Sequence, residues 1–396
     1  MTYFLIIALC VIVLISYIFE LTGKFTKIPG VILLVVTGMA ANYLLEYLNI
    51  KIPDFSSLLP IMGTLGLILI VLEGSLDLTI SRKKGLLIGS SITSAIMLFV
   101  IFEIIFTYIL VNFYGIPSRT ALINTIPLGI ISSAVAIPSA ARLSRNDKEF
   151  VTYESSFSDI VGILAFDFIL FNYSSLGNGI LGFVSDLLLT IIGSIVFSII
   201  LAYILHKINH HVKHVIITAM VILVYALAKM VHMPSLLVVL VFGLIMNNSS
   251  FLKNKYSLKI IDFDEFKKEL QLFKNITYEL TFVIRSFFFI TFGYYTSVAD
   301  LLDIGNLLIA LVVSATIFII RALYFIIVLK KSLNPLLYFA PRGLITILLF
   351  LSIPVGISLP FINKGLITQV IFITILMMTF GSVFFSKPEK KLEVET

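Results

Sequence analysis

Hydrophobic residues dominate this chain in long runs that recur from one end to the other. Most runs hold roughly 20 mainly apolar residues, the length of α-helix that crosses a hydrocarbon layer about 30 Å thick at 1.5 Å per residue. The pattern therefore predicts an all-α polytopic membrane protein with about 13 transmembrane helices. We place these spans near residues 2–20, 28–49, 57–80, 86–114, 118–143, 149–173, 178–206, 213–231, 234–248, 273–297, 301–329, 335–357 and 365–386.

Composition supports a single membrane domain over residues 1–396. The chain is 59% hydrophobic and 13% charged, with a mean hydropathy of +1.10, and a soluble domain of this length does not have such a composition. The first run, Thr2–Phe19, has no basic residue before it and no small-residue cleavage site after it, which favours a retained helix over a signal peptide. The single cysteine, Cys10, excludes a disulfide within the chain.

Basic residues alternate between the two sides of the predicted membrane. The net charge of +6 alone would suit a nucleic-acid binder, but most Lys and Arg residues fall in loops on one side, which the positive-inside rule places in the cytoplasm. We therefore expect no nucleic-acid partner, a cell-membrane location, an external N-terminus and a cytoplasmic C-terminus. The basic residues elsewhere are Lys51, Arg119, Lys229 and Lys364 on the other side, and Arg285, Arg321 and Arg342 within spans.

The longest loop divides the predicted spans into two groups. In residues 249–272 lysines alternate with apolar residues, which predicts a cytoplasmic amphipathic linker lying on the membrane surface, with a plain solvated linker as the alternative. The second to sixth spans and the ninth to thirteenth would then form inverted repeats, a layout common in secondary transporters.

Two carboxylates lie in the sixth span, where ionisable residues are costly and mark function or a partner. Ser155 and Asp159 are four residues apart and share a helix face, while Glu154 and Ser158 share the neighbouring one. A carboxylate among hydroxyls and carbonyls suits a small hard cation. Burial favours the protonated carboxyl once the cation leaves, so the two ligands would compete. The alternative is a structural role for Asp159 in hydrogen bonding.

Prolines predict interruptions in two spans at corresponding positions of the two repeats. In the fifth span Pro138 removes a backbone donor from the carbonyl of Ala134, so we expect unwinding there. In the twelfth span Pro341, Gly343 and Pro354 predict a second interruption. Freed backbone is tolerated at membrane depth only where it faces a cavity or a site, so the pair predicts two broken helices that cross at an ion site.

The membrane arginines need partners because arginine stays protonated. We expect Glu154 to pair with Arg321, and Arg342 to hold the carbonyls of the broken segment or to pair with Glu73. Glu73 itself would line a cytoplasmic funnel, while Asp77 near it would be solvated. His206, His210, His211 and His214 lie in a cytoplasmic loop, where a solvated basic patch is favoured over a pH-sensing face; Glu103, Asp167 and Asp186 receive no role.

Taken in order, several motifs resemble the monovalent cation/proton antiporter superfamily, in particular its sodium/proton exchangers. The resemblance covers the whole chain. It is carried by Leu72-Glu73-Gly74, Leu76-Asp77-Leu78, Ser133-Ala134-Val135-Ala136-Ile137-Pro138, Ser158-Asp159, Ile284-Arg285-Ser286-Phe287-Phe288-Phe289, Arg321 and Pro341-Arg342-Gly343.

The resemblance implies an antiporter without a cofactor, which exchanges a monovalent cation for H+. Asp159 would bind Na+ and proton in turn. Its co-ligands would be Ser155, Ser158 and the backbone around Ser133, Ala134 and Ala136. A mobile core (residues 86–173 and 273–357) would move like an elevator against a dimerisation scaffold (residues 1–80, 178–248 and 365–386) in a homodimer surrounded by lipid.

One position departs from the family pattern. Relatives carry Asn-Asp or Asp-Asp where this chain has Ser158-Asp159, and electrogenic relatives carry a lysine in the helix that here holds Arg321. The departure predicts electroneutral one-for-one exchange and leaves Na+, K+ and Li+ open.

Two other functions compete with antiport. An organic-anion/sodium symporter of similar fold would need an open apolar cavity beside its cation sites. A membrane-embedded lipid-modifying enzyme would need a catalytic group at headgroup level. The short basic loops show no such constellation, so we expect no enzyme.

Overall fold

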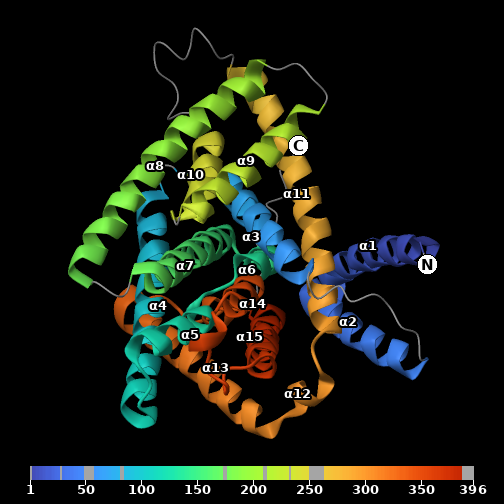
Figure 1. Ribbon diagram of the computed structural model, residues 1–396, viewed down its shortest axis with the longest axis vertical. Coiled ribbons are helices and arrows are strands. Elements are labelled where there is room, and N and C mark those ends of the chain that lie inside the picture. The colour runs from blue at the N-terminus through green and yellow to red at the C-terminus, as the bar shows by residue number, and fades with distance from the viewer. Residues whose placement is uncertain are drawn as a thin grey trace, which may run out of the picture. The chain divides into compact units, whose positions relative to one another are not determined.

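A computed structural model describes residues 2–26, 29–48, 58–80, 84–172, 176–207, 212–231, 233–248 and 263–385 (Figure 1). Across these ranges every long element is a helix, which confirms the predicted all-α fold. Within them, nine helical segments are long and apolar enough to cross a membrane, and Leu9–Gly23 and Ser235–Asn247 are shorter apolar helices.

The helices follow the hydrophobic runs closely, since each predicted span contains at least one helix. They are α1 (Thr2–Thr26), α2 (Gly30–Tyr47), α3 (Leu58–Asp77), α4 (Gly85–Tyr114), α5 (Ser118–Gly129), α6 (Ser133–Ser139), α7 (Arg145–Asn172), α8 (Leu176–Lys207), α9 (Lys213–Met230), α10 (Ser235–Asn247), α11 (Phe263–Tyr294), α12 (Val298–Leu302), α13 (Ile304–Tyr324), α14 (Leu344–Leu351) and α15 (Lys364–Phe384).

The start of α11 differs from the prediction. Residues 263–272, expected in the amphipathic linker, form the first part of this helix. Phe266 and Leu270 are buried on one side of it, while Lys267 and Lys268 are exposed. Residues 263–272 are therefore amphipathic, with apolar residues on one side and lysines on the other, and they continue without a break into the rest of α11. The rest of the linker, residues 249–262, lies outside the described residues.

The chain divides into two compact units. The first comprises residues 1–59, 86–162 and 286–396, and the second residues 60–85 and 163–285. Most of the two ranges expected to form the mobile core fall in the first unit, together with α1, α2 and α15. The division into core and scaffold remains a prediction, because compactness alone does not determine which helices move.

Within the first unit, small residues let helices approach closely. A Cβ built on Gly38 of α2 would lie 2.1 Å from the carbonyl oxygen of Ile290 in α11, and one built on Gly293 would lie 2.2 Å from that of Val35. Association of helices in lipid depends on such close packing, because water exclusion cannot drive it there. α13 packs on α15 in the same unit.

Within the second unit, polar side-chain contacts join the helices. α10 packs against α8 and α9. Lys229 Nζ of α9 lies 2.9 Å from Asp167 Oδ1 of α7, and Glu269 of α11 accepts from Lys213 Nζ at 2.8 Å. Tyr278 donates to Asp77, which is partly exposed as expected.

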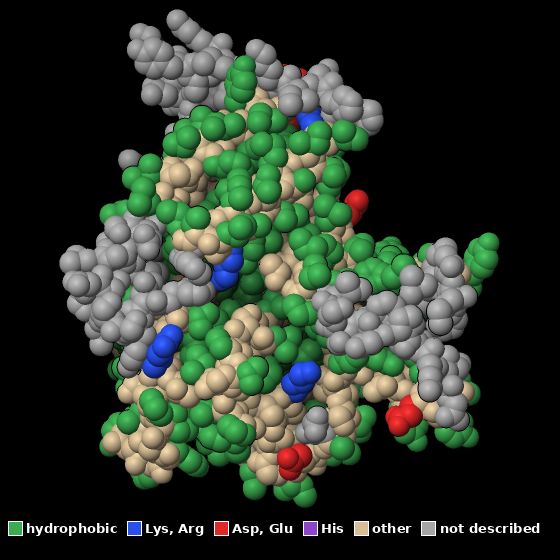
Figure 2. Space-filling model, in the orientation of Figure 1, with side chains coloured by type: hydrophobic (Ala, Val, Ile, Leu, Met, Phe, Trp, Pro, Cys, Tyr) green, Lys and Arg blue, Asp and Glu red, His purple; other side chains and the backbone are tan. Residues whose placement is uncertain are grey.

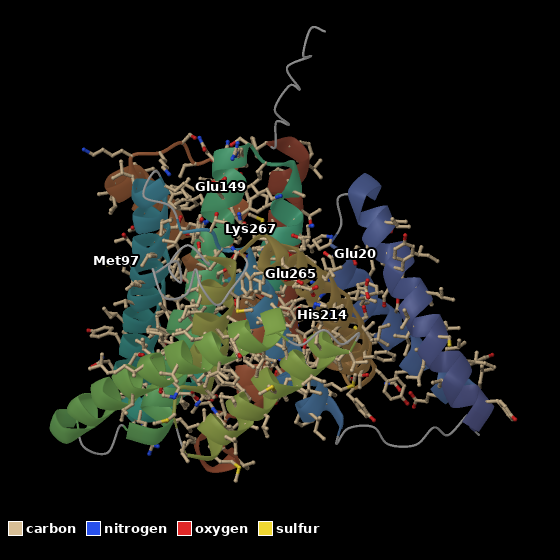
Figure 3. The ribbon with its side chains drawn as sticks, turned by 90° about the horizontal axis from the view of Figure 1, so that it is seen from above. Glu20, Met97, Glu149, His214, Glu265 and Lys267 are labelled. Carbon is tan, nitrogen blue, oxygen red and sulfur yellow. The ribbon has the colours of Figure 1, made fainter. Side chains whose placement is uncertain are left out.

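The expectation that His214 is solvated is wrong. It is 6% exposed, and its Nε2 lies 3.2 Å from Glu269 Oε2, because the long α11 covers the start of α9 (Figure 3). The side chain of His206 and all of His210 and His211 lie outside the described residues.

The outer surface is apolar, as a lipid-facing protein requires. Figure 2 shows hydrophobic side chains over much of the visible face and few charged ones. Large apolar residues such as Leu86 and Ile104 of α4 are exposed, and Met97 of the same helix, labelled in Figure 3, is 41% exposed. Such a surface would aggregate in water, whereas in a bilayer it costs nothing.

Candidate ion site

The fifth predicted span is broken in the middle. α5 ends at Gly129, α6 begins at Ser133, and the three residues between them are not helical. Tertiary partners satisfy the amides of this segment: Ile131 N donates to Ser158 Oγ at 2.9 Å, Ser132 N to Pro341 O at 2.9 Å, and Ser133 N to Asp159 Oδ2 at 3.3 Å. The helix is therefore interrupted where other parts of the unit replace its own hydrogen bonds.

The predicted position of this break is wrong. Pro138 lies inside α6, and Ala140 N donates to Ala136 O across it, so the chain is helical where unwinding was expected. The proline deprives only the carbonyl of Ala134 of its amide donor. The amides of Ile131, Ser132 and Ser133 instead donate to other parts of the unit, and the interruption lies at residues 130–132.

A second interruption lies in the twelfth predicted span, as expected. After a 3₁₀ turn at Leu336–Tyr338 the chain is non-helical to Gly343, and α14 begins at Leu344. The bond from Ser132 N to Pro341 O joins the two interrupted segments directly. A Cβ built on Gly343 would lie 2.7 Å from Ser132 Oγ, so the segments cross in contact. The prediction of two crossed broken helices is confirmed.

Substitution of Gly343 tests how tightly this crossing is packed. In Gly343→Ala the new methyl would meet Ser132 Oγ at 2.7 Å and Val135 Cγ2 at 2.9 Å. We expect a loss of about 1–3 kcal/mol in stability, the usual cost of overpacking, measured by thermal unfolding of the purified protein. Gly356→Ala is the control, since a Cβ there has nothing within 4 Å. Equal stability of the two variants would contradict the close crossing.

Asp159 of α7 lies beside this crossing. It is 3% exposed, and its Oδ2 accepts from both the hydroxyl and the backbone N–H of Ser133. Its Oδ1 is buried and has no hydrogen-bond partner among the described residues. Ser158 next to it accepts from Ile131 N, while Ser155 donates to Val151 O at 2.8 Å within its own helix. One carboxylate oxygen is thus held in place and the other is available.

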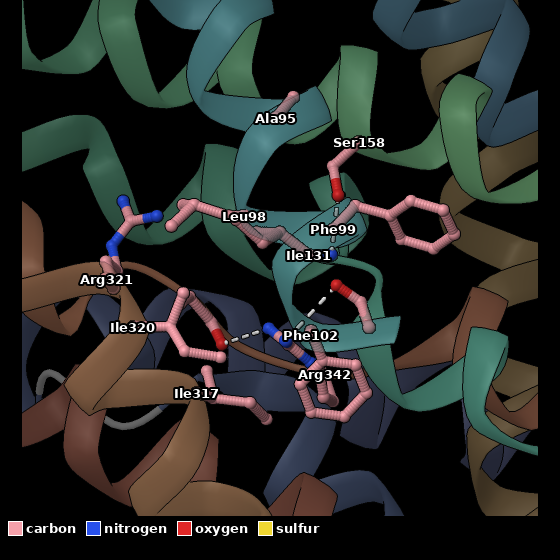
Figure 4. A pocket seen from close by; sticks show the side chains of 12 residues that line it. Ala95, Leu98, Phe99, Phe102, Ile131, Ser158, Ile317, Ile320, Arg321 and Arg342 are labelled. Atoms are coloured by element: carbon pink, nitrogen blue, oxygen red, sulfur yellow. Dashed lines mark hydrogen bonds between the residues drawn. The ribbon is translucent and has the colours of Figure 1, made fainter. Parts of the chain in front are cut away.

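Arg342 holds the end of the other broken helix. Its Nε donates to Leu128 O at 2.6 Å. Its Nη2 donates to Gly129 O at 3.3 Å and its Nη1 to Ala340 O at 2.9 Å (Figure 4). The carbonyls at a helix C-terminus carry partial negative charge, so a guanidinium there is favourable. Of the two partners considered for Arg342, the structure has the carbonyls; Glu73 lies on α3, half-buried, in the second unit.

Glu154 and Arg321 form the predicted ion pair. Arg321 Nη1 and Nη2 donate to the two carboxylate oxygens at 2.8 and 2.6 Å, and both side chains are 1% exposed. Ser94 of α4 donates to Glu154, and Arg321 Nε donates to Leu336 O at 3.0 Å. The pair therefore ties α7, α4 and α13 to the chain just before the second interruption.

A small cavity of about 10 Å³ is lined in part by both interrupted segments. Its volume is enough for a single water molecule. Polar groups reach it from Ser158, Arg321 and Arg342 (Figure 4). Its remaining lining is mostly apolar: Ala95, Leu98, Phe99, Phe102, Gly129, Ile131, Ile317, Ile320 and Ala340.

Sequence reasoning missed three polar residues around the crossing. Ser132 Oγ is buried there without a partner among the described residues, and Asn124 ties α5 to the chain after α14 by bonds to Ile357 O and Leu359 N. The third is Glu103 of α4. A polar residue inside a long apolar run was the available signal in each case, but the sequence does not show which groups such a residue contacts in the fold.

The comparison with known families decides what kind of protein this is. The family model described as "Sodium/hydrogen exchanger, transmembrane" matches residues 10–388, nearly the whole chain. The chain belongs to the sodium/hydrogen exchanger family. The resemblance drawn from its motifs is thereby confirmed.

Solved structures agree on the fold of this exchanger family member. The sodium proton antiporter MjNhaP1 from Methanocaldococcus jannaschii at pH 8 matches with a TM-score of 0.70 at 22% identity, over 96% of this chain and 98% of that one. A second structure of MjNhaP1, described as an electron microscopy map, matches with a TM-score of 0.69 at 22% identity, over 96% and 95%. No curated protein sequence matches the chain.

The geometry of this exchanger family member gives the crossing a definite chemistry. Oxygen ligands suit hard cations such as Na+, and the free Oδ1 of Asp159 can accept either a cation or a proton. In a buried setting one negative charge favours one positive ligand at a time. Oδ1 of Asp159, which has no partner among the described residues, is therefore the candidate position for such a ligand.

Proposed function

We propose that this chain exchanges a monovalent cation for H+ across the membrane, with Na+ as the first candidate and K+ or Li+ as alternatives. Cation and proton compete for Asp159, and no cofactor takes part. Family membership and the likeness to a sodium proton antiporter support this function.

The available oxygen of Asp159 is the observation that carries the proposal. It is buried at the crossing of two broken helices, where the hydroxyl of Ser132 is also buried without a partner among the described residues. Ser133 donates to the other oxygen, and Ser158 accepts from Ile131 N of the interrupted segment. Ser155 and the carbonyls of Ala134 and Ala136 remain candidate co-ligands.

We further propose that exchange is electroneutral, one cation for one proton. Arg321 is engaged by Glu154 in a bidentate pair, and arginine does not release its proton. Arg342 is engaged by carbonyls. Neither arginine can then exchange a proton in each cycle, and Asp159 alone changes ligand.

The remaining parts of the proposal concern movement and orientation. Residues 86–173 and 273–357 would move as an elevator against the scaffold of a homodimer in the cell membrane. Glu73 would line the cytoplasmic funnel. The excess of basic residues on one side supports an external N-terminus and a cytoplasmic C-terminus.

Proteoliposomes containing the purified chain test the proposal. Addition of Na+, K+ or Li+ outside vesicles loaded with a pH-sensitive dye should move protons in the opposite direction. A membrane potential imposed by a K+ ionophore, with Na+ or Li+ as substrate, should leave the rate unchanged. Proton movement absent with all three cations would contradict exchange, and a rate that follows the potential would contradict the one-for-one ratio.

A further inference from the structure

Glu103 is a buried carboxyl that the proposed exchange does not use. Glu103 lies in the middle of α4, is 6% exposed, and belongs to the same unit as the crossing. Its Oε2 lies 2.6 Å from the hydroxyl of Thr125 in α5. Its Oε1 is buried and has no hydrogen-bond partner among the described residues. An ionised carboxylate in this setting would have one oxygen without any donor, which is costly.

The hydroxyl of Thr125 has more acceptors than it has hydrogens. Besides Glu103, it lies 3.0 Å from Ala121 O and 3.2 Å from Leu122 O of its own helix. A threonine hydroxyl within a helix commonly donates to the carbonyl four residues before it. If its one hydrogen serves Ala121, the short contact to Glu103 needs a hydrogen from the acid. The geometry then requires Glu103 to be the donor, and so to be protonated.

Glu103 also lies against the residue whose carbonyl Arg342 holds. A Cβ built on Gly129 would be 2.7 Å from Glu103 Oε1, while Gly129 O accepts from Arg342 Nη2 at 3.3 Å. A neutral acid leaves the guanidinium on the carbonyls of α5. A carboxylate would compete for it, because charge-assisted bonds are about twice as strong as neutral ones.

The other charged groups around the crossing already have partners. Glu154 is bound by Arg321, and Asp159 receives two donors from Ser133. α5 and residues 339–343 bring two polar side chains towards Glu103. Thr125 can form a hydrogen bond with its carboxyl, and Arg342 can pair with its negative charge. A proton on Glu103 keeps this arrangement intact.

We propose that Glu103 is a second proton-binding site, holding a proton that it donates to Thr125. On release of this proton to water at alkaline pH, Arg342 leaves the end of α5 for the carboxylate, and transport falls. The proton is not exchanged in each cycle, so the one-for-one ratio at Asp159 is unchanged. The expected fall of transport at alkaline pH rests on the proposed exchange function. The presence of a proton on Glu103 does not depend on that function.

Infrared spectroscopy of the purified full chain tests the protonation directly. The background is Asp159→Asn, which removes the carboxyl at the crossing. At neutral pH this variant should show a protonated-carboxyl band that is lost in Asp159→Asn/Glu103→Gln. Adding Asp167→Asn instead should leave the band, because Asp167 is paired with Lys229 at 2.9 Å. Adding Thr125→Val should raise the band frequency by removing the acceptor.

Two infrared results would overturn the proposal. One is the same spectrum with and without Glu103→Gln, which would mean that Glu103 is ionised. The other is a Glu103 band that vanishes on adding Na+ at constant pH, which would make Glu103 a cation ligand. The Thr125→Val shift decides the question even where the double variant with Gln does not fold.

Transport against pH tests the consequence. In Glu103→Gln an amide replaces the acid as donor, so the rate at neutral pH should stay within about threefold of wild type, and activity should extend to more alkaline pH than in wild type. Identical alkaline limits would overturn the role given to Arg342. Absence of exchange in the wild type would contradict the proposed function. It would not affect the infrared test of whether Glu103 is protonated.

Discussion

Asp159→Asn should reduce cation-driven proton movement in proteoliposomes to the level of protein-free vesicles. The asparagine keeps the shape of the side chain and an oxygen that can accept from Ser133, so the crossing should survive. It removes the charge that balances a bound cation, and it removes the group that takes the proton. Because both ligands depend on this one carboxylate, neither half of the exchange can proceed.

Asp167→Asn is the matched control for this loss. It makes the same substitution on the same helix, at a carboxylate paired with Lys229. It should therefore leave exchange measurable. Dye-monitored proton flux and radioactive Na+ uptake should be compared for the wild type and both variants, reconstituted at equal protein density. Cation-driven flux that persists in Asp159→Asn would remove the basis of the proposed mechanism.

Glu154→Gln should destabilise the protein by about 3–5 kcal/mol, the cost of breaking a buried ion pair from one side. The substitution leaves the guanidinium of Arg321 buried at 1% exposure beside neutral groups: the new amide oxygen, Leu336 O and the ring of Phe325 at 4.6 Å. None of these carries the negative charge that would neutralise the guanidinium. Thermal or denaturant unfolding of the detergent-solubilised protein measures the loss.

A double-mutant cycle separates the pair from its surroundings. Glu154→Leu/Arg321→Met replaces both charges with apolar groups, and such replacements of buried pairs are often neutral or stabilising. We therefore expect the double variant to be more stable than either single variant. The single variants of this cycle are Glu154→Leu and Arg321→Met. If the stability lost in the double variant equals the sum of the losses in these two, Glu154 and Arg321 do not act as a pair.

Hydrophobicity along the chain fixed the helices, because the length and apolar character of a span are local properties. The run expected at residues 86–114 contains nearly all of α4, and the run expected at residues 301–329 contains α13. The ion pair of Glu154 with Arg321 also followed from the sequence, since a buried guanidinium requires a carboxylate and few were available in the spans.

The tertiary structure decided where backbone is freed and which groups meet it. The sequence placed the first break at Pro138, but it lies at residues 130–132, because Ser158, Pro341 and Asp159 accept from the amides there. Such partners come from segments far apart in the chain.

The same reason explains the other differences. Arg342 holds carbonyls of the opposite broken helix, His214 is covered by α11, and Glu103 meets Thr125 across two helices. Each depends on how helices pack, which the hydrophobic pattern of a single span does not contain. The sequence by itself determined the membrane helices and the family of the chain, while packing determined the contacts of the charged residues, because those contacts join segments far apart in the chain.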